Sequence, residues 1–156
     1  MADMSGITKT TILLAEDDEN DVMLIRRAFS KSHVVNPIAC VANGEEAVAY
    51  LAGEGRYADR TAHPLPFMML LDLKLPRLSG HEVLKWLRGQ NGLRRLPVVV
   101  LTSSREERDL VEGYRLGVNA FVVKPVDFQQ FTESVRRIGC FWALVNEPPP
   151  RSVRAR

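Results

Sequence analysis

Residues 67–80, FMMLLDLKLPRLSG, contain the pattern that decides the fold of this chain. Their apolar first half is short and uninterrupted, which is typical of a strand buried on both faces, and Pro76 and Gly80 indicate a loop after it. Asp72 stands where this strand should emerge. Because burying an unpaired charge is costly, we expect other side chains to compensate the Asp72 carboxylate.

The composition is that of one ordinary globular domain. The 156 residues are 46% hydrophobic and 26% charged, which argues against disorder, and a net charge of +2 is too small to indicate a nucleic-acid partner. The sequence shows no signal peptide and no apolar run long enough to span a bilayer, so we expect a cytoplasmic protein that does not bind membranes. Cys40 and Cys140 lie in apolar surroundings and are expected to be buried, reduced thiols.

Five strand patterns alternate with five helix patterns. The expected strands are 10–15, 37–41, the central stretch from 67, 96–101 and 120–123, and the expected helices are 19–31, 45–51, 81–88, 105–116 and 128–142. Asn43, Ser104 and Asp127 are expected helix caps, Gly117 is expected to close a helix, and residues 53–66 are expected to form an extended surface loop. This alternation predicts an α/β domain with a parallel sheet over residues 10–146, between a loose tail at 1–9 and a Pro-rich basic tail at 147–156.

Polar residues follow four of the expected strands. They are Glu16 and Asp17, Asp72, Thr102 and Lys124. In an open parallel sheet, ligands bind beyond the carboxyl ends of the strands. These residues are therefore expected to face one crevice, although more than a hundred positions separate the first from the last.

The same residues carry a family resemblance. Glu16–Asp17, Asp72 with Pro76 and Gly80, Thr102–Ser103 and Lys124–Pro125, in this order, resemble the receiver domain of two-component response regulators. The resemblance covers about residues 10–145. It implies a flavodoxin-like fold with five parallel strands in the order 2-1-3-4-5, flanked by five helices, and a single-domain phosphoacceptor signalling protein rather than an enzyme.

The resemblance implies that Asp72 accepts a phosphoryl group from a sensor histidine kinase. Close carboxylates repel one another, by about 4 kcal/mol per pair at an effective dielectric constant near 20, and Mg²⁺ would relieve this repulsion. By the family pattern, Asp17 binds Mg²⁺ directly, Glu16 binds it through water, and Asp72 and the carbonyl oxygen of Lys74 complete the protein ligands.

The phosphoryl group and the switch involve four other side chains. Lys124 would pair with a phosphoryl oxygen, Thr102 would bind another through its hydroxyl, and Ser103 would offer its backbone N–H. Phe121 stands at the position of the family's switch aromatic and is expected to fill space that Thr102 vacates. Lys74 and Ser104 flank the path of a hydrolytic water, and we expect this pair to set the lifetime of the phosphorylated state.

Two features are similar to the small regulators that pair with bacterial phytochrome kinases. They are the long loop 54–66 and the aromatic pair Phe141–Trp142. Exposed aromatic residues near the end of the chain indicate a homodimer, whereas the alternative is that Trp142 packs on its own domain. No winged helix follows Val145, so we expect no direct DNA binding.

Alternatives remain at the level of the sequence. Residues 16–19 could be an acidic first helical turn, and Phe121 could be only a core residue. A haloacid-dehalogenase-like phosphatase also forms an aspartyl phosphate, but it needs a second Asp where this chain has Lys74. A flavodoxin-like carrier would place flavin phosphate beside residues 16–19, which would repel it, and a receiver-like adaptor that is never phosphorylated stays open.

Overall fold

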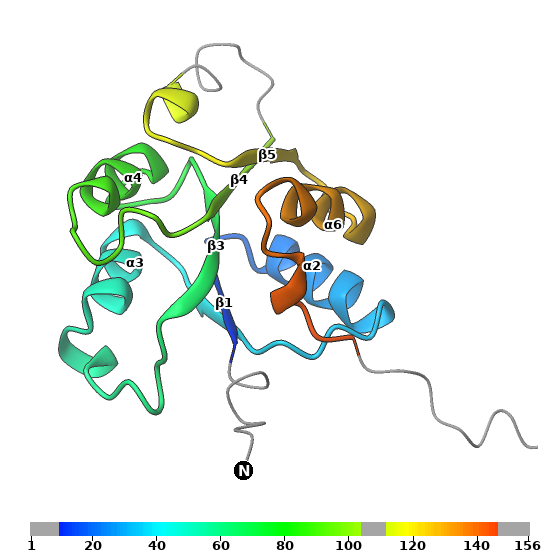
Figure 1. Ribbon diagram of the computed structural model, residues 1–156. Helices are drawn as coiled ribbons and strands as arrows, with labels where there is room; N and C mark the ends of the chain where they lie inside the picture. The colour runs from blue at the N-terminus through cyan, green and yellow to red at the C-terminus, as the bar shows by residue number, and fades with distance from the viewer. Residues whose placement is uncertain (1–9, 104–111, 147–156) are drawn as a thin grey trace, which may run out of the picture.

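One parallel sheet forms the centre of the protein (Figure 1). The computed structural model describes residues 10–103 and 112–146. The strands are β1 (Thr11–Ala15), β2 (Ile38–Val41), β3 (Pro66–Asp72), β4 (Val98–Thr102) and β5 (Ala120–Val123). Their order is β2-β1-β3-β4-β5, and every neighbouring pair is parallel. The predicted α/β fold and strand order are confirmed.

Helices cover both faces of this sheet. They are α2 (Glu19–Lys31), α3 (Gly44–Ala52), α4 (Gly80–Arg88) and α6 (Phe128–Arg137), and residues 112–115 are also helical. In Figure 1, α3 and α4 lie on one face and α2 and α6 on the other. Alternate residues of β1 and β3 enter two apolar clusters, with Leu13 and Met69 on the α3–α4 side and Ile12 and Met68 on the α2–α6 side. The two central strands are therefore buried on both faces, as predicted.

Each of these four helices begins at a residue whose side chain accepts a backbone N–H. The caps are Asp18, Asn43, Ser79 and Asp127. The predicted caps at Asn43 and Asp127 are confirmed. Gly117, with φ of +77°, follows the helical residues 112–115 as predicted, whereas the predicted cap Ser104 lies outside the described residues. In the described part of the chain, no helix is both long and apolar enough to cross a membrane.

The last helix is shorter than predicted. It ends at Arg137, and Gly139 then adopts a left-handed φ of +76°, which a helix cannot continue through. A separate 3₁₀ turn, η2 (Phe141–Ala143), carries Trp142, which is 81% exposed. The alternative that Trp142 packs on its own domain is therefore wrong.

The segment after η2 returns to the start of the sheet. The side-chain amide of buried Asn36 donates to the carbonyl oxygens of Ala143 at 2.8 Å and Thr10 at 3.1 Å. Its oxygen accepts the backbone N–H of Val145 at 2.7 Å. Because a buried amide must be hydrogen-bonded, Asn36 fixes this segment against the first strand.

Two predictions about single side chains are wrong. Cys40 is exposed because β2 is an edge strand, although Cys40 and the half-buried Cys140 are both free thiols, as predicted. The loop 53–66 is not wholly a surface loop, since Tyr57 at the end of η1 (Gly55–Tyr57) is buried. Its ring lies 5.1 Å from those of Tyr50 and His63, and His63 is half-buried.

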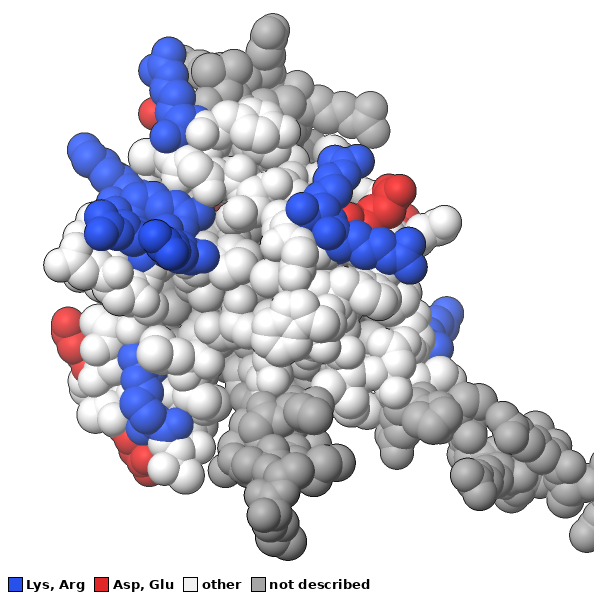
Figure 2. Space-filling model, viewed as in Figure 1, with Lys and Arg blue, Asp and Glu red and all other residues white. Residues whose placement is uncertain are grey.

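Basic side chains gather over α4 and α6 in Figure 2. The last turns of these helices contain Lys85 and Arg88, and Arg136 and Arg137. Acidic residues instead occupy the first turns of α2, α3 and α4. Because helices start at the carboxyl end of a parallel sheet, the helix dipoles and these charges agree in sign at both ends of the molecule.

Arg88 joins three segments at the amino end of the sheet. Its guanidinium donates to four carbonyl oxygens, those of Arg94 at 2.7 Å, Leu96 at 3.0 Å, Leu116 at 3.0 Å and Gly117 at 2.7 Å. The first two precede β4, and the other two follow the helical residues 112–115. One side chain thus ties the end of α4 to both loops.

We predict that Arg88→Met destabilises the domain by about 2 kcal/mol, because partly buried carbonyls lose a charged donor. For a domain of this size, the melting temperature should fall by about 4–8 °C. The control is Lys85→Met, an exposed position in the same helical turn. Equal melting temperatures for the two variants would contradict a structural role for Arg88.

Candidate functional site

Four strands end in one row at the carboxyl edge of the sheet. These ends are Ala15, Asp72, Thr102 and Val123. In the parallel register, Thr102 lies opposite Val123. Glu16 and Lys124 therefore emerge directly beyond β1 and β5, on either side of Asp72. The structure brings the predicted residues together as the topology requires.

Lys124 is the centre of the charge arrangement. Its Nζ lies 2.5 Å from Glu16 Oε1, 3.1 Å from Asp21 Oδ2 and 3.2 Å from Asp72 Oδ2. The side chain of Lys124 is only 12% exposed. Burial acts to lower the pKa of Lys124, but the hydrogen bond to Glu16, the charge of Asp72 and the hydrogen bond to Asp21 together raise this pKa above its ordinary value. The ammonium therefore stays charged among the three carboxylates.

Glu16 is the most deeply buried acid of the group. Its side chain is 1% exposed, and Oε2 accepts the backbone N–H of Asp18 at 3.1 Å. Burial raises the pKa of Glu16 to about 7, against the lowering effect of the hydrogen bonds from Lys124 and Asp18. A second cation beside Glu16 would therefore stabilise its ionised form, which is what a metal ligand requires.

Three carboxylates form a group that fits a metal ion. Glu16, Asp17 and Asp72 each offer one oxygen, and these oxygens all lie within 4.8 Å of one another. Asp17 is exposed, whereas Glu16 and Asp72 are buried. An all-oxygen donor set that is partly open to water suits a hard divalent cation such as Mg²⁺ or Mn²⁺ rather than zinc.

The loop after β3 is held in place by two glycines. Gly80 donates its N–H to Leu73 O at 2.9 Å, and a Cβ on Gly80 would lie 2.6 Å from Asp72 O. Gly44 at the start of α3 donates to Pro76 O at 3.2 Å, and a Cβ there would lie 2.0 Å from the carbonyl oxygen of Leu78. The close approach of these backbones explains why both positions need glycine.

The remaining predicted residues surround this arrangement. Lys74 donates its backbone N–H to Asp72 Oδ1 at 3.2 Å, while its side chain is exposed. Thr102 is buried at the end of β4, and Ser103 is exposed. The half-buried ring of Phe121 packs against exposed Tyr114, with 4.9 Å between their centroids. Ser104, the predicted partner of Lys74, lies outside the described residues.

The acidic residues border one cleft of about 500 Å³, together with Lys74, Ser103 and Lys124 but without Thr102 and Phe121. It is lined by Glu16, Asp17, Asp18, Asp21, Asp72, Lys74, Ser103, Lys124 and Pro125. Asp18 is the cap of α2, which agrees with its interpretation as part of an acidic first turn. Asp21 was not predicted as a site residue. Its place in the first turn of the expected helix 19–31, directly after Glu16 and Asp17, could have indicated it.

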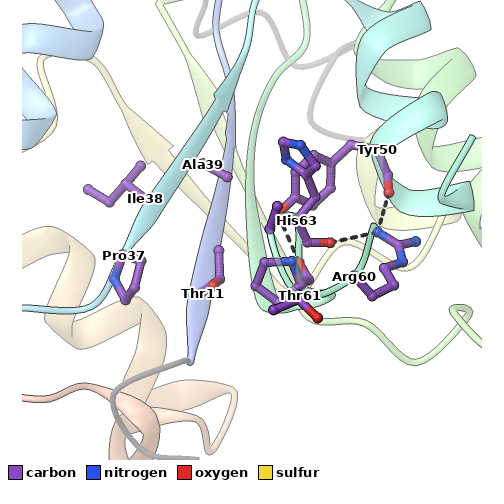
Figure 3. Close-up of a pocket in the computed structure, with 10 residues that line it drawn as sticks. Thr11, Pro37, Ile38, Ala39, Tyr50, Arg60, Thr61 and His63 are labelled. Atoms are coloured by element: carbon purple, nitrogen blue, oxygen red, sulfur yellow. Dashed lines mark hydrogen bonds between the residues drawn. The ribbon is translucent and has the colours of Figure 1, made fainter. Parts of the chain in front are cut away.

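A second cavity lies at the opposite edge of the sheet (Figure 3). It measures about 580 Å³ and lies between the strand starts near Thr11 and Ile38 and a wall that includes Tyr50 and Arg60. The guanidinium of Arg60 already donates to the carbonyls of Tyr50 at 2.8 Å, Leu51 at 2.8 Å and His63 at 3.0 Å. Since Arg60 closes the end of α3 in this way, its role there is structural.

Comparisons with known proteins agree with this site. The model of the response regulator receiver domain matches residues 12–136. Among curated proteins, a probable methanogenesis regulatory protein, FilR2 of Methanothrix harundinacea, is 38% identical over 88% of this chain and 86% of its own length. Response regulator Rcp1 of Synechocystis sp. is 35% identical over 91% of this chain and 94% of its own length.

Solved structures give the same result. The bacteriophytochrome response regulator AtBRR is 49% identical with a TM-score of 0.80, over 89% of this chain and 99% of that chain. The phosphorylated cyanobacterial phytochrome response regulator RcpA is 39% identical with a TM-score of 0.72, over 86% of this chain and 94% of that chain. The Mn²⁺-bound form of Rcp1 is 33% identical with a TM-score of 0.70, over 90% of this chain and 99% of that chain. This chain belongs to the receiver domain family of response regulators, which act in phosphorylation-based two-component signalling.

Proposed function

We propose that Asp72 is the phosphoacceptor and that the cleft around it works as a Mg²⁺-dependent phosphoryl-transfer site. The observation that carries this proposal is the position of Lys124, whose ammonium lies 3.2 Å from the Asp72 carboxylate, and Asp72 also belongs to the group of oxygen ligands formed with Glu16 and Asp17. Phosphoryl transfer depends on positioning and charge neutralisation more than on covalent catalysis, and this cleft offers both.

Transfer would proceed by attack of a carboxylate oxygen of Asp72 on the phosphorus of a phosphohistidine donor. The bond between phosphorus and the donor nitrogen breaks as the acyl phosphate bond forms. Glu16, Asp17, Asp72 and the carbonyl of Lys74 would hold Mg²⁺, which when bound neutralises charge on the carboxylates and on the phosphoryl oxygens. In this proposal the protein takes part in its own phosphorylation and dephosphorylation, without being an enzyme that acts on other substrates.

Other side chains would receive the phosphoryl group. Lys124 pairs with one of its oxygens, the hydroxyl of Thr102 donates to another, and Ser103 adds its backbone N–H. Movement of Thr102 toward the phosphoryl group would open space for Phe121, whose ring now contacts the exposed Tyr114. The phosphorylated and unphosphorylated forms would thus differ on the surface around Tyr114.

The partners follow from the relatives. Since AtBRR and RcpA are described as phytochrome response regulators, we propose a phytochrome-type sensor histidine kinase as the donor. We also propose a homodimer through the last helices, α6 and η2. This assignment is supported by Phe141, which is 40% exposed and stacks under Arg136 with 5.0 Å from ring to guanidinium, and by the neighbouring Trp142.

The acceptor assignment is tested with acetyl phosphate and Mg²⁺, read by intact mass. We expect the wild type to gain the mass of one phosphoryl group and Asp72→Asn to gain none, because an amide is a poor nucleophile. Asp127→Asn is the control, since this exposed carboxylate caps α6 and lies outside the cleft. A wild type that stays unmodified in the presence of Mg²⁺ would instead favour an adaptor that is never phosphorylated.

The lifetime hypothesis is tested at Lys74, whose long side chain lines the cleft beside Asp72. We expect Lys74→Asn to shorten the half-life of the acyl phosphate, by up to about tenfold or 1.4 kcal/mol, because the shorter amide opens a path for water and can orient it. Lys74→Met keeps the bulk of the side chain and removes its charge. It therefore distinguishes steric blocking of the water from an electrostatic effect of the Lys74 ammonium. An unchanged half-life of the acyl phosphate in both variants would contradict the hypothesis that Lys74 sets the lifetime of the phosphorylated state.

The dimer is tested by sedimentation. We expect Trp142→Ala to shift a wild-type dimer toward the monomer mass, because Trp142 is the most exposed large hydrophobic residue in the part of the chain that the structure describes, at 81%. Tyr114→Ala is the matched control, since Tyr114 is also an exposed aromatic, at 63%, and belongs to another surface. Equal masses for wild type and Trp142→Ala would remove the dimer proposal.

A further inference from the structure

Asp21 contacts the functional lysine from outside the set of residues that the family pattern indicates. It lies in the first turn of α2, and its Oδ2 is 3.1 Å from Lys124 Nζ. Asp21 is 103 positions from Lys124 in the sequence. It lines the same cleft as Asp72 but does not belong to the group of Glu16, Asp17 and Asp72 whose oxygens could bind one metal ion.

The donors of Lys124 are already used. An ammonium group has three N–H bonds, and the Nζ of Lys124 faces the three carboxylates of Glu16, Asp21 and Asp72. A phosphoryl group on Asp72 would add acceptor oxygens beside the same Nζ. For Lys124 to pair with a phosphoryl oxygen, one of its present contacts must therefore weaken or break.

The three partners differ in how easily they can be released. The side chain of Glu16 is 1% exposed, so its carboxylate left without Lys124 would be a buried charge. Asp72, at 8% exposure, would itself carry the phosphoryl group, so Lys124 stays beside it when it pairs with a phosphoryl oxygen. The side chain of Asp21 is 24% exposed, and water can solvate its carboxylate after release. Asp21 is thus the partner that Lys124 can leave at the smallest cost.

We propose that Asp21 is a positioning residue that competes with the phosphoryl group for the ammonium of Lys124. In the unphosphorylated protein it holds Lys124 toward α2, and on phosphorylation Lys124 exchanges Asp21 for a phosphoryl oxygen. This inference rests on the proposed function of Asp72. It implies that the acid at position 21 lowers the affinity of the cleft for a phosphoryl group, with no part in the transfer itself.

The test uses fluoroberyllate, a tetrahedral mimic of a phosphoryl group, titrated at saturating Mg²⁺ and followed by fluorine NMR. We expect Asp21→Asn to bind fluoroberyllate about fivefold more tightly than the wild type, because the neutral amide competes weakly for Lys124. A residue with a merely structural role would weaken binding when replaced, so the sign of the change separates the two roles. Asp21→Glu should return the affinity toward that of the wild type.

The matched control is Asp18→Asn. Asp18 lines the same cleft and carries the same charge, but its Oδ1 accepts the backbone N–H of Asn20 at 2.8 Å, and Asn caps a helix as well as Asp does. If Asp18→Asn and Asp21→Asn bound fluoroberyllate equally more tightly than the wild type, the net charge of the cleft would explain the effect. This result would overturn the proposal. Weaker or unchanged binding in Asp21→Asn would overturn it as well.

The same titration separates this inference from the proposed function. If the wild type binds fluoroberyllate and Asp72→Asn does not, the phosphoacceptor site stands whatever Asp21 does. If the wild type fails to bind it at saturating Mg²⁺, the cleft does not accept a phosphoryl group, and both proposals fall together.

Discussion

A buried ammonium surrounded by carboxylates is the constraint on which the rest of the structure depends. Burial acts against the charge of both Lys124 and Glu16, and the hydrogen bond between them favours the charged form of each. Each of these buried charges therefore needs its oppositely charged partners close by. This mutual dependence requires that the side chains following β1 and β5 reach Asp72 at the end of β3, and the parallel register places these strand ends on one edge of the sheet.

Stability and chemistry are placed at opposite edges of the sheet. At the amino edge, Arg60 donates to backbone carbonyls at the end of α3, and Arg88 donates to backbone carbonyls that tie the end of α4 to two loops. At the carboxyl edge, Gly44 and Gly80 let the backbone of the β3–α4 loop approach closely enough to fix Asp72. The cleft can therefore hold strongly interacting charges, because the elements that present them are secured elsewhere.

The sequence predicts the fold and the convergence of Asp72 and Lys124, since apolar runs reveal parallel strands and the carboxyl ends of parallel strands share an edge. It could not predict contacts that depend on how a helix or loop is turned. Asp21 lies on a helix rather than at a strand end, so its approach to Lys124 follows from the docking of α2. The exposure of Cys40 depends on which strand lies at the edge of the sheet. The exposure of Trp142 depends on the left-handed turn at Gly139, which ends the last helix before it.

The contacts of Lys124 also bear on how the domain can change state. A cleft whose ammonium already points at the acceptor needs little rearrangement to bind a new anion there, because its charges are oriented before the anion arrives. The change is then an exchange of partners within reach of one flexible side chain, and the sheet beneath it can stay as it is. In the proposed switch, the contact of Phe121 with the exposed Tyr114 carries such a local exchange from Thr102 to the surface. A tightly packed core is thus compatible with signalling, since the proposed phosphorylated and unphosphorylated forms differ at the carboxyl edge of the sheet and not in the core.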